Sequence, residues 1–145
     1  LKSALEQIEP EYDYILIDCP PALNMLTLNA LCTAQAVMIP MQCEYYALEG
    51  LSDLVNTIKR VRSNFNSALR IEGLLRTMFD PRNILAQQVS EQLQKHFGNK
   101  VYRTVIPRNV RLAEAPGFGT PVLYHDGQSK GAQAYLDLAK EILSN

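Results

Sequence analysis

The chain has 145 residues, of which 47% are hydrophobic and 20% are charged, and it contains no tryptophan. This is enough chain to bury the core of one domain, and no apolar run reaches the roughly 18 residues that a membrane-spanning helix needs. The net charge of −1 conceals a separation: residues 1–58 hold one basic and eight acidic side chains, whereas residues 59–111 hold eleven basic and three acidic ones.

The first half of the chain predicts two strands and two helices. Short apolar runs are typical of strands that are buried on both faces of a parallel sheet, and longer runs with apolar residues every three or four positions are typical of helices. In chain order we expect a strand at Tyr14–Asp18, a helix at Leu23–Thr33, a strand at Ala36–Pro40 and a helix at Ala47–Phe65.

The second half continues this alternation. A strand is expected at Ile71–Phe79, and Asp80-Pro81 suits a helix start, with Asp80 as N-cap and Pro81 in the first helical position. That helix should end at Gly98, and a strand at Val101–Ile106 should follow it.

The C-terminal third begins with a segment rich in glycine and proline. Residues 107–127 hold three of the eight prolines, which predicts a long ordered surface loop or a loop that encloses a short helix and strand. A last helix should run from the N-cap Ser129 to Leu143, with Tyr135 and Leu138 among its inward residues. Strands separated by helices indicate an α/β fold, with a mostly parallel sheet and flanking helices in a doubly wound arrangement.

One carboxylate stands out by its position. Asp18 ends the first apolar strand, as in a Walker B segment, which aims an aspartate at a phosphate-bound Mg²⁺. The 145 residues contain no GxxxxGK[ST] loop to hold the phosphates, so we expect the phosphate cradle to lie upstream of Leu1. The alternative from the residues alone is that Asp18 simply caps the following helix.

Other candidates lie where the later strands end. Ligands of open α/β sheets bind at the carboxyl ends of the strands, which here are the Thr77–Asp80 turn and the segment Pro107–Asn109. Cys19, Cys32 and Cys43 lack metal-type spacing and are expected to be reduced thiols, packed as small apolar residues. His96 and His125 are expected to be isolated surface residues.

Several segments together resemble one family. "YDYILIDCPPALNMLTLNAL", "VMIPMQCEYYALEGLSDL", "LLRTMFDPRN", "VYRTVIPRNVRLAEAPGFGTPV" and "GAQAYLDLAKEI" are similar to the ParA/Soj chromosome-partitioning ATPases, the deviant Walker A group that includes MinD. The resemblance covers Tyr12 to Ile142 in the right order and spacing. It implies a P-loop NTPase-type fold, of which residues 1–145 are the C-terminal portion of a single ATPase domain.

The resemblance implies a nucleotide site. Asp18 would act on Mg²⁺ through water and would be the catalytic carboxylate in this portion; Cys19-Pro20-Pro21 would begin the segment that senses the γ-phosphate. Thr77, Met78, Pro107, Arg108 and Asn109 would flank the adenine of ATP. The alternative for Met78 is an ordinary core methionine.

The resemblance also implies a DNA site. Arg82 and Arg111 match arginines with which relatives grip DNA without sequence preference, and Arg103 and Arg108 are reserve candidates. All four lie in the basic segment 59–111, whose charge by itself suits a polyanion. The alternatives are that Lys59, Arg60 and Arg62 merely solvate a helix face, and that the loop arginines pair with acids such as Glu114.

The resemblance finally implies a function. An ATP-bound homodimer would bind nonspecific DNA in the bacterial cytoplasm, at the nucleoid, and a ParB/Spo0J-type centromere-binding partner would stimulate hydrolysis. The intact parent would be an ATPase, whereas the 145 residues alone would be inactive. Two alternatives remain: a MinD-like membrane-associated positioning ATPase, which the two acids and one lysine of the C-terminal tail disfavour, and a nonenzymatic DNA-binding or scaffold fragment.

Overall fold

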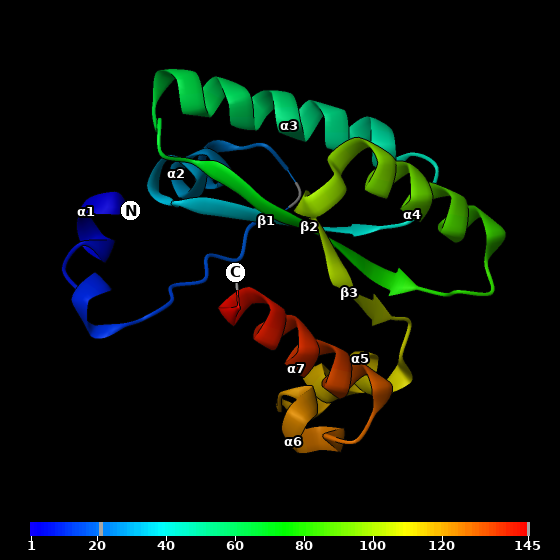
Figure 1. Cartoon of the computed structure of the whole chain (residues 1–145). Coiled ribbons are helices and arrows are strands. Elements are labelled where there is room, and N and C mark those ends of the chain that lie inside the picture. Colours follow the sequence, from blue (N-terminus) through cyan, green and yellow to red (C-terminus); the bar gives the residue numbers. More distant parts are fainter. Residues whose placement is uncertain (21, 145) are drawn as a thin grey trace. The chain divides into compact units, whose positions relative to one another are not determined.

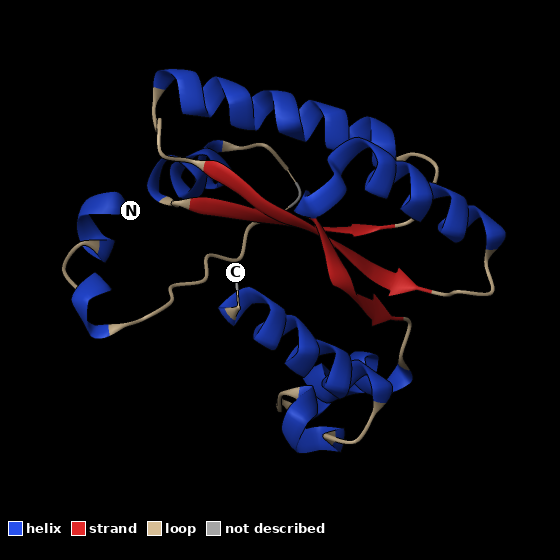
Figure 2. Cartoon of the chain, in the orientation of Figure 1, coloured by secondary structure: helices blue, strands red, loops and turns tan. Residues whose placement is uncertain are grey.

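The computed structural model describes residues 1–20 and 22–144, and its helices and strands alternate along the chain (Figures 1 and 2). The α-helices are α1 (Lys2–Leu5), α2 (Met25–Thr33), α3 (Ala47–Asn64), α4 (Ile84–Phe97), α5 (Val110–Glu114), α6 (Val122–Asp126) and α7 (Lys130–Leu143). The strands are β1 (Ala36–Gln42), β2 (Arg70–Phe79) and β3 (Val101–Pro107). Short 3-10 helices are η1 (Glu9–Glu11), η2 (Gly98–Lys100) and η3 (Ala115–Phe118).

The chain divides into two compact units. Unit 1 comprises Leu1–Val37 and Leu51–Glu72, and unit 2 comprises Met38–Gly50 and Gly73–Asn145. The division passes through β1, α3 and β2, so each of these elements contributes residues to both units.

Unit 1 is organised around α2 and α3. Its buried apolar side chains are Ala30, Leu31, Leu51, Ile58, Val61 and Leu69. Helix α2 begins at the N-cap Asn24, whose side chain accepts hydrogen bonds from two backbone amides. At its other end Asn66 Nδ2 donates to the carbonyl oxygens of Leu31 (3.0 Å) and Ala34 (2.8 Å). Because the last carbonyls of a helix lack intrahelical partners, Asn66 satisfies these groups and ties α2 to the segment after α3.

Unit 2 contains most of the sheet. Its strands lie in the order β1-β2-β3, and β2 and β3 are parallel. Figure 1 shows α4 and α7 on opposite sides of β2 and β3. A core cluster of Leu75, Tyr102, Ile106 and Leu138 packs α7 on the strands. This confirms the predicted mostly parallel sheet with helices on both faces.

The pairing of β2 with β3 is irregular next to a buried arginine. Leu74 pairs with Val101 and Arg76 with Val105, so β3 advances by four residues where β2 advances by two. Arg76 is only 8% exposed, and its Nη2 donates to the carbonyl oxygens of Tyr102 (2.8 Å) and of the next residue (3.1 Å). These side-chain bonds satisfy backbone carbonyls in the stretch where the strand pairing is interrupted.

A carboxylate satisfies amides of the same stretch. Glu141 of α7 accepts hydrogen bonds from the backbone N–H groups of Arg103 (2.7 Å) and Thr104 (2.9 Å). Burial raises the pKa of Glu141, but the hydrogen bonds from Thr104 and Arg103 outweigh it and leave the pKa below its usual value. Helix α7 is therefore fixed to β3 by polar bonds as well as by apolar packing.

On the other face of β2, Arg76 reaches helix α4. Its Nη1 donates to Ser90 Oγ at 2.9 Å, and both side chains are buried. Burial lowers the pKa of Arg76, although the nearby Cys43 and Glu141 act in the opposite direction. One guanidinium thus links β2, β3 and α4.

The predicted first strand is wrong for the described residues. Residues 14–18 form no strand, and the side chains of Tyr14, Ile15 and Leu16 are exposed, Leu16 to 92%, whereas Ile17 is half-buried. A strand needs a neighbouring strand to receive its backbone hydrogen bonds, and β1, β2 and β3 form a sheet without this segment. The apolar pattern therefore marks a segment suited to burial, but the described residues do not bury it.

The predicted start of α4 is also wrong. Asn83, not Asp80, is the N-cap, because its Oδ1 accepts from the backbone N–H groups of Leu85 (3.0 Å) and Ala86 (3.3 Å). Asp80 and Pro81 instead form a turn before the helix. The predicted stop at Gly98 is confirmed, with a φ of 51° that favours glycine.

The C-terminal third contains more helix than predicted. After Pro107, which ends β3, residues 108–127 hold α5, η3 and α6 and no strand. Ser129 caps α7 as expected, with its Oγ accepting from the Ala132 amide. Leu138 is buried, but Tyr135 is 43% exposed and Ala139 is exposed, so the inward face of α7 is narrower than its apolar pattern suggested.

We predict that Arg76→Leu lowers the free energy of unfolding by about 1–3 kcal/mol, because it leaves buried carbonyl oxygens without a donor. Urea unfolding of the variant, followed by circular dichroism, measures this loss. Arg70→Leu is the matched control, since the Arg70 side chain is 58% exposed and forms an ion pair with Glu72. Equal losses in the two variants would contradict the role of Arg76.

Candidate functional site

The carboxyl ends of β2 and β3 lie side by side in unit 2. Phe79 pairs with Pro107, and the Arg108 amide donates to the Phe79 carbonyl at 3.2 Å. The predicted residues Thr77 and Met78 precede this pair on β2. The structure therefore brings the two predicted strand-end segments together.

Met78 has an unusual backbone. Its φ of 51° lies in the left-handed region, and the pairing of β2 with β3 is irregular between Arg76 and Phe79. Its side chain is 47% exposed, so the alternative of an ordinary core methionine is wrong. Strained backbone of this kind is kept only where the surrounding structure fixes it, and it is frequent at ligand sites.

The side-chain oxygen of Asn109 is engaged in a helix-capping hydrogen bond. Its Oδ1 accepts from the Leu112 amide at 3.3 Å and caps α5. The first turn of α7 packs closely here, because a Cβ on Gly131 would lie 2.5 Å from Leu112 Cγ and 3.1 Å from Asn109 Oδ1. A glycine at this position lets α7 approach the segment that follows β3.

A shallow, largely apolar groove of about 410 Å³ adjoins the strand ends. It is lined by Phe79, Pro81, Val105, Pro107, Lys130, Gln133, Ala134 and Asp137. Four of these belong to α7, which sequence reasoning did not associate with the site. The only signal in the sequence was that Ser129 places the start of this helix shortly after the Pro107–Asn109 segment.

Asp18 belongs to unit 1, in an exposed segment without regular structure. Among residues 1–20 and 22–144, no three acidic, histidine or cysteine side chains are grouped so that they could hold a metal ion. One carboxylate is nevertheless compatible with Mg²⁺, which commonly binds through one or two carboxylates, water and substrate phosphates. Asp18 is thus of the right type, but the described residues do not complete a Mg²⁺ site.

The three cysteines differ from the expectation that all of them are packed as small apolar residues. The Cys19 thiol is exposed and Cys32 is partly exposed, so only Cys43 of the three is packed as a buried residue. Burial raises the pKa of the Cys43 thiol, and the charge of Arg76 opposes this shift. Pro21, which was assigned to the γ-phosphate segment, lies outside the described residues.

Arg82 is held by a neighbouring acid. Its Nε and Nη2 donate to the two carboxylate oxygens of Asp80 at 3.0 Å and 2.8 Å, and the Arg82 amide donates to Asp80 Oδ1. The side chain of Arg82 is still 89% exposed. These bonds bring the pKa of the Asp80 carboxyl down to about 2.

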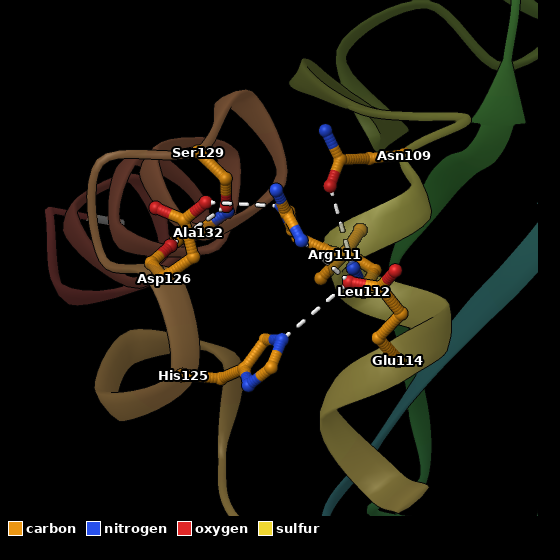
Figure 3. Close-up of polar contacts among 8 residues, drawn as sticks. All are labelled: Asn109, Arg111, Leu112, Glu114, His125, Asp126, Ser129 and Ala132. Atoms are coloured by element: carbon orange, nitrogen blue, oxygen red, sulfur yellow. Dashed lines mark hydrogen bonds and ion pairs between the residues drawn. The ribbon is translucent and has the colours of Figure 1, made fainter.

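Arg111 is held by two acids (Figure 3). Its Nη1 lies 2.8 Å from Glu114 Oε2, and its Nε lies 3.3 Å from Asp126 Oδ2. The hydrogen bond from Arg111 is the main cause of a lowered pKa at Glu114. The predicted alternative of a loop arginine paired with Glu114 is therefore the arrangement found, and Asp126 adds a partner from α6.

His125 is not isolated, contrary to expectation. Its Nε2 lies 3.5 Å from Glu114 Oε2, and its ring stacks on Phe118 with centroids 4.8 Å apart.

The two reserve candidates for DNA contact differ in their surroundings. Arg103 Nε lies 3.8 Å from Glu141 Oε1, whereas Arg108 is exposed near Asp80.

Comparison with known proteins shows which family the chain resembles. A family model described as an AAA domain matches residues 1–71. The whole chain is 57% identical over 145 residues to the sporulation initiation inhibitor protein Soj of Bacillus subtilis, covering 57% of that protein. It is 55% identical over 146 residues to the chromosome partitioning protein ParA of Caulobacter vibrioides, covering 99% of this chain and 55% of that protein. Over nearly its whole length the chain is similar to the Soj/ParA chromosome-partitioning ATPases. It spans about half the length of these curated relatives.

Solved structures share the fold. A cobyrinic acid a,c-diamide synthase of Mycobacterium smegmatis, solved with an ATP analogue and magnesium, is 33% identical with a TM-score of 0.80, covering 98% of this chain and 52% of that chain. The cell division ATPase MinD of Pyrococcus furiosus is 23% identical with a TM-score of 0.79, covering 99% and 56%, and this likeness shows the fold alone. No helix in the described part of the chain is long and apolar enough to cross a membrane.

We predict that the Asp80 carboxyl titrates near pH 2, well below its usual value of 3.8. Because the folded-state pKa is depressed, any stability that the pair provides is present above about pH 4 and is lost as the pH falls toward 2. An NMR titration of Asp80 measures the pKa directly. In Arg82→Ala it should return toward its usual value, and an unchanged pKa in that variant would refute the pairing.

Proposed function

We propose that this chain is part of a ParA-type DNA-segregation ATPase. It would supply the strand ends that flank the adenine and the arginines that contact DNA. ATP and Mg²⁺ would stabilise a homodimer that binds DNA without sequence preference, and hydrolysis stimulated by a ParB-type partner would release it. The observation that carries the proposal is the 57% identity to Soj over all 145 residues. The nucleotide can drive such a cycle only through different affinities for monomer and dimer.

The proposed adenine site is the joined ends of β2 and β3. Thr77, Met78 and Pro107–Asn109 would flank the base, and the exposed, strained Met78 beside the Phe79–Pro107 pair supports this assignment. Backbone groups at such strand ends can read the edge of a base, and the proline stiffens the loop that presents them. The Oδ1 of Asn109 caps α5, so this residue would face the nucleotide through its backbone or its Nδ2.

The proposed Mg²⁺ contact is Asp18. A carboxylate can orient a water of the Mg²⁺ hydration shell, and the nucleotide phosphates would supply the other ligands. The 145 residues contain no GxxxxGK[ST] loop, so the proposal assigns phosphate binding to no residue of this chain.

The proposed DNA contacts are Arg82 and Arg111. Both side chains are more than half exposed and belong to unit 2. Arginine contacts to phosphate carry no base information, so they suit nonspecific binding at the nucleoid in the cytoplasm. The proposal includes no stable membrane association, because the C-terminal tail has two acids and one lysine rather than a basic amphipathic face.

We predict that Asp18→Ala lowers Mg²⁺-dependent ATP hydrolysis by at least about tenfold, because the metal loses its carboxylate partner. The measurement is phosphate release by the complete protein in which this chain occurs, with DNA and the ParB-type partner present. Asp13→Ala is the control, since it removes an exposed acid from the same segment. The 145 residues alone should not hydrolyse ATP. Full turnover in Asp18→Ala would contradict the assignment.

We predict that Arg82→Ala and Arg111→Ala each weaken ATP-dependent DNA binding equally for all sequences. Each loss of a phosphate contact should flatten the slope of log affinity against log salt by about one unit. Fluorescence anisotropy with two unrelated duplexes measures both effects, and Arg70→Ala is the control. Loss of ATP affinity with unchanged DNA affinity would instead make Arg111 a nucleotide residue.

A further inference from the structure

The groups around Arg111 determine how much positive charge this site offers to an anion. Its two acidic partners come from different elements, Glu114 from α5 and Asp126 from α6 (Figure 3). The pairs use Nη1 and Nε, so Nη2 lies outside both of them. An anion that approaches this guanidinium therefore meets two nitrogens that already have acidic partners.

The site is not positive as it stands. Two carboxylates face one guanidinium, which is an excess of one negative charge when His125 is neutral. A phosphate that approaches Arg111 is attracted by the guanidinium and repelled by both acids at similar distances. The number of basic side chains in residues 59–111 does not show this local excess of negative charge, because Glu114 and Asp126 lie beyond that segment.

We propose that Glu114 and Asp126 set the affinity of the Arg111 site by competing with the phosphates of DNA for the guanidinium. This inference rests on the proposed contact between Arg111 and DNA. In the unbound state the carboxylates take the place of a phosphate, and binding requires that the Glu114 carboxylate leave Nη1. Glu114 and Asp126 are therefore positioning residues that act through Arg111.

The surroundings of Glu114 suit such an exchange of partners. His125 Nε2 lies 3.5 Å from the same oxygen, Oε2, that contacts Arg111. The imidazole is held in place, because its side chain is only 17% exposed and it stacks on Phe118. When Glu114 releases Arg111, it retains a polar neighbour, which lowers the cost of the release.

The opposite role for the acids would be to align the guanidinium for DNA. Exposed ion pairs restrain side chains only weakly, and the Arg111 side chain is 53% exposed. The excess of negative charge therefore outweighs any gain from alignment. The two roles predict opposite changes in DNA affinity when a carboxylate is neutralised: competition predicts tighter binding, and alignment predicts weaker binding.

The test is the DNA affinity of Glu114→Gln and Asp126→Asn in the complete protein, with ATP and Mg²⁺, at low salt. Each variant should bind DNA about threefold more tightly, the Coulomb effect of one unit charge at roughly 6 Å in water. The gain should vanish in the double variant Arg111→Ala/Glu114→Gln and shrink at high salt. Glu72→Gln is the matched control, because Glu72 pairs with a different arginine, Arg70, at 2.9 Å.

The outcomes separate this inference from the function on which it rests. Unchanged or weaker DNA binding in both neutralised variants, with ATP affinity and thermal unfolding as in the wild type, overturns the competition. A gain of equal size in Glu72→Gln also overturns it, because the effect would then be one of net charge alone. If Arg111→Ala binds DNA as well as the wild type, the proposed DNA contact itself fails.

Discussion

The geometry of unit 2 depends on the polar clamp that Arg76 and Glu141 place on β3. Where the two parallel strands lose register, Arg76 donates to two carbonyls of β3 and Glu141 accepts from two of its amides. Unsatisfied backbone groups at a buried interruption would each cost about 1–3 kcal/mol. The irregular stretch is kept because one side chain from β2 and one from α7 replace the missing strand partners.

This clamp also fixes what lies beyond it. Arg76 is anchored to β3 and α4 two residues before Met78, and Phe79 is paired with Pro107 directly after it. With both neighbours held, the strained backbone of Met78 has no room to relax, which keeps its side chain at the surface. The candidate nucleotide site is thus a consequence of how the strands are clamped rather than of a separate loop structure.

Periodicity predicted the elements whose partners lie within the chain. The strands at residues 36–40, 71–79 and 101–106 and the helices α2, α3 and α7 follow from apolar spacing and from the cap Ser129. The segment 14–18 has the same apolar character but forms no strand, because a strand also depends on a neighbour that periodicity does not report. For α4, Asp80 and Asn83 are both good N-caps, and Arg82 occupies the carboxylate of the first.

The clamp could not be predicted from the sequence. Arg76 occurs within a basic segment and reads as one more surface charge, yet it is 8% exposed and bonds to residues 14 to 27 positions away. Glu141 lies on an amphipathic helix, where an acid normally faces solvent, and its partners are 37 and 38 positions earlier. Contacts at such separations depend on the fold, and local patterns carry no trace of them.

The positive charge that residues 59–111 present at the surface also could not be predicted from the sequence. The eleven basic side chains of this segment are divided between the units, with four in unit 1 and seven in unit 2. Arg76 is buried, and Arg70, Arg82, Arg103 and Arg111 are engaged with acids. The excess of base along the sequence therefore overstates the charge that a polyanion would meet. At Arg82 and Arg111 the neighbouring acids therefore reduce the positive charge that a phosphate would meet.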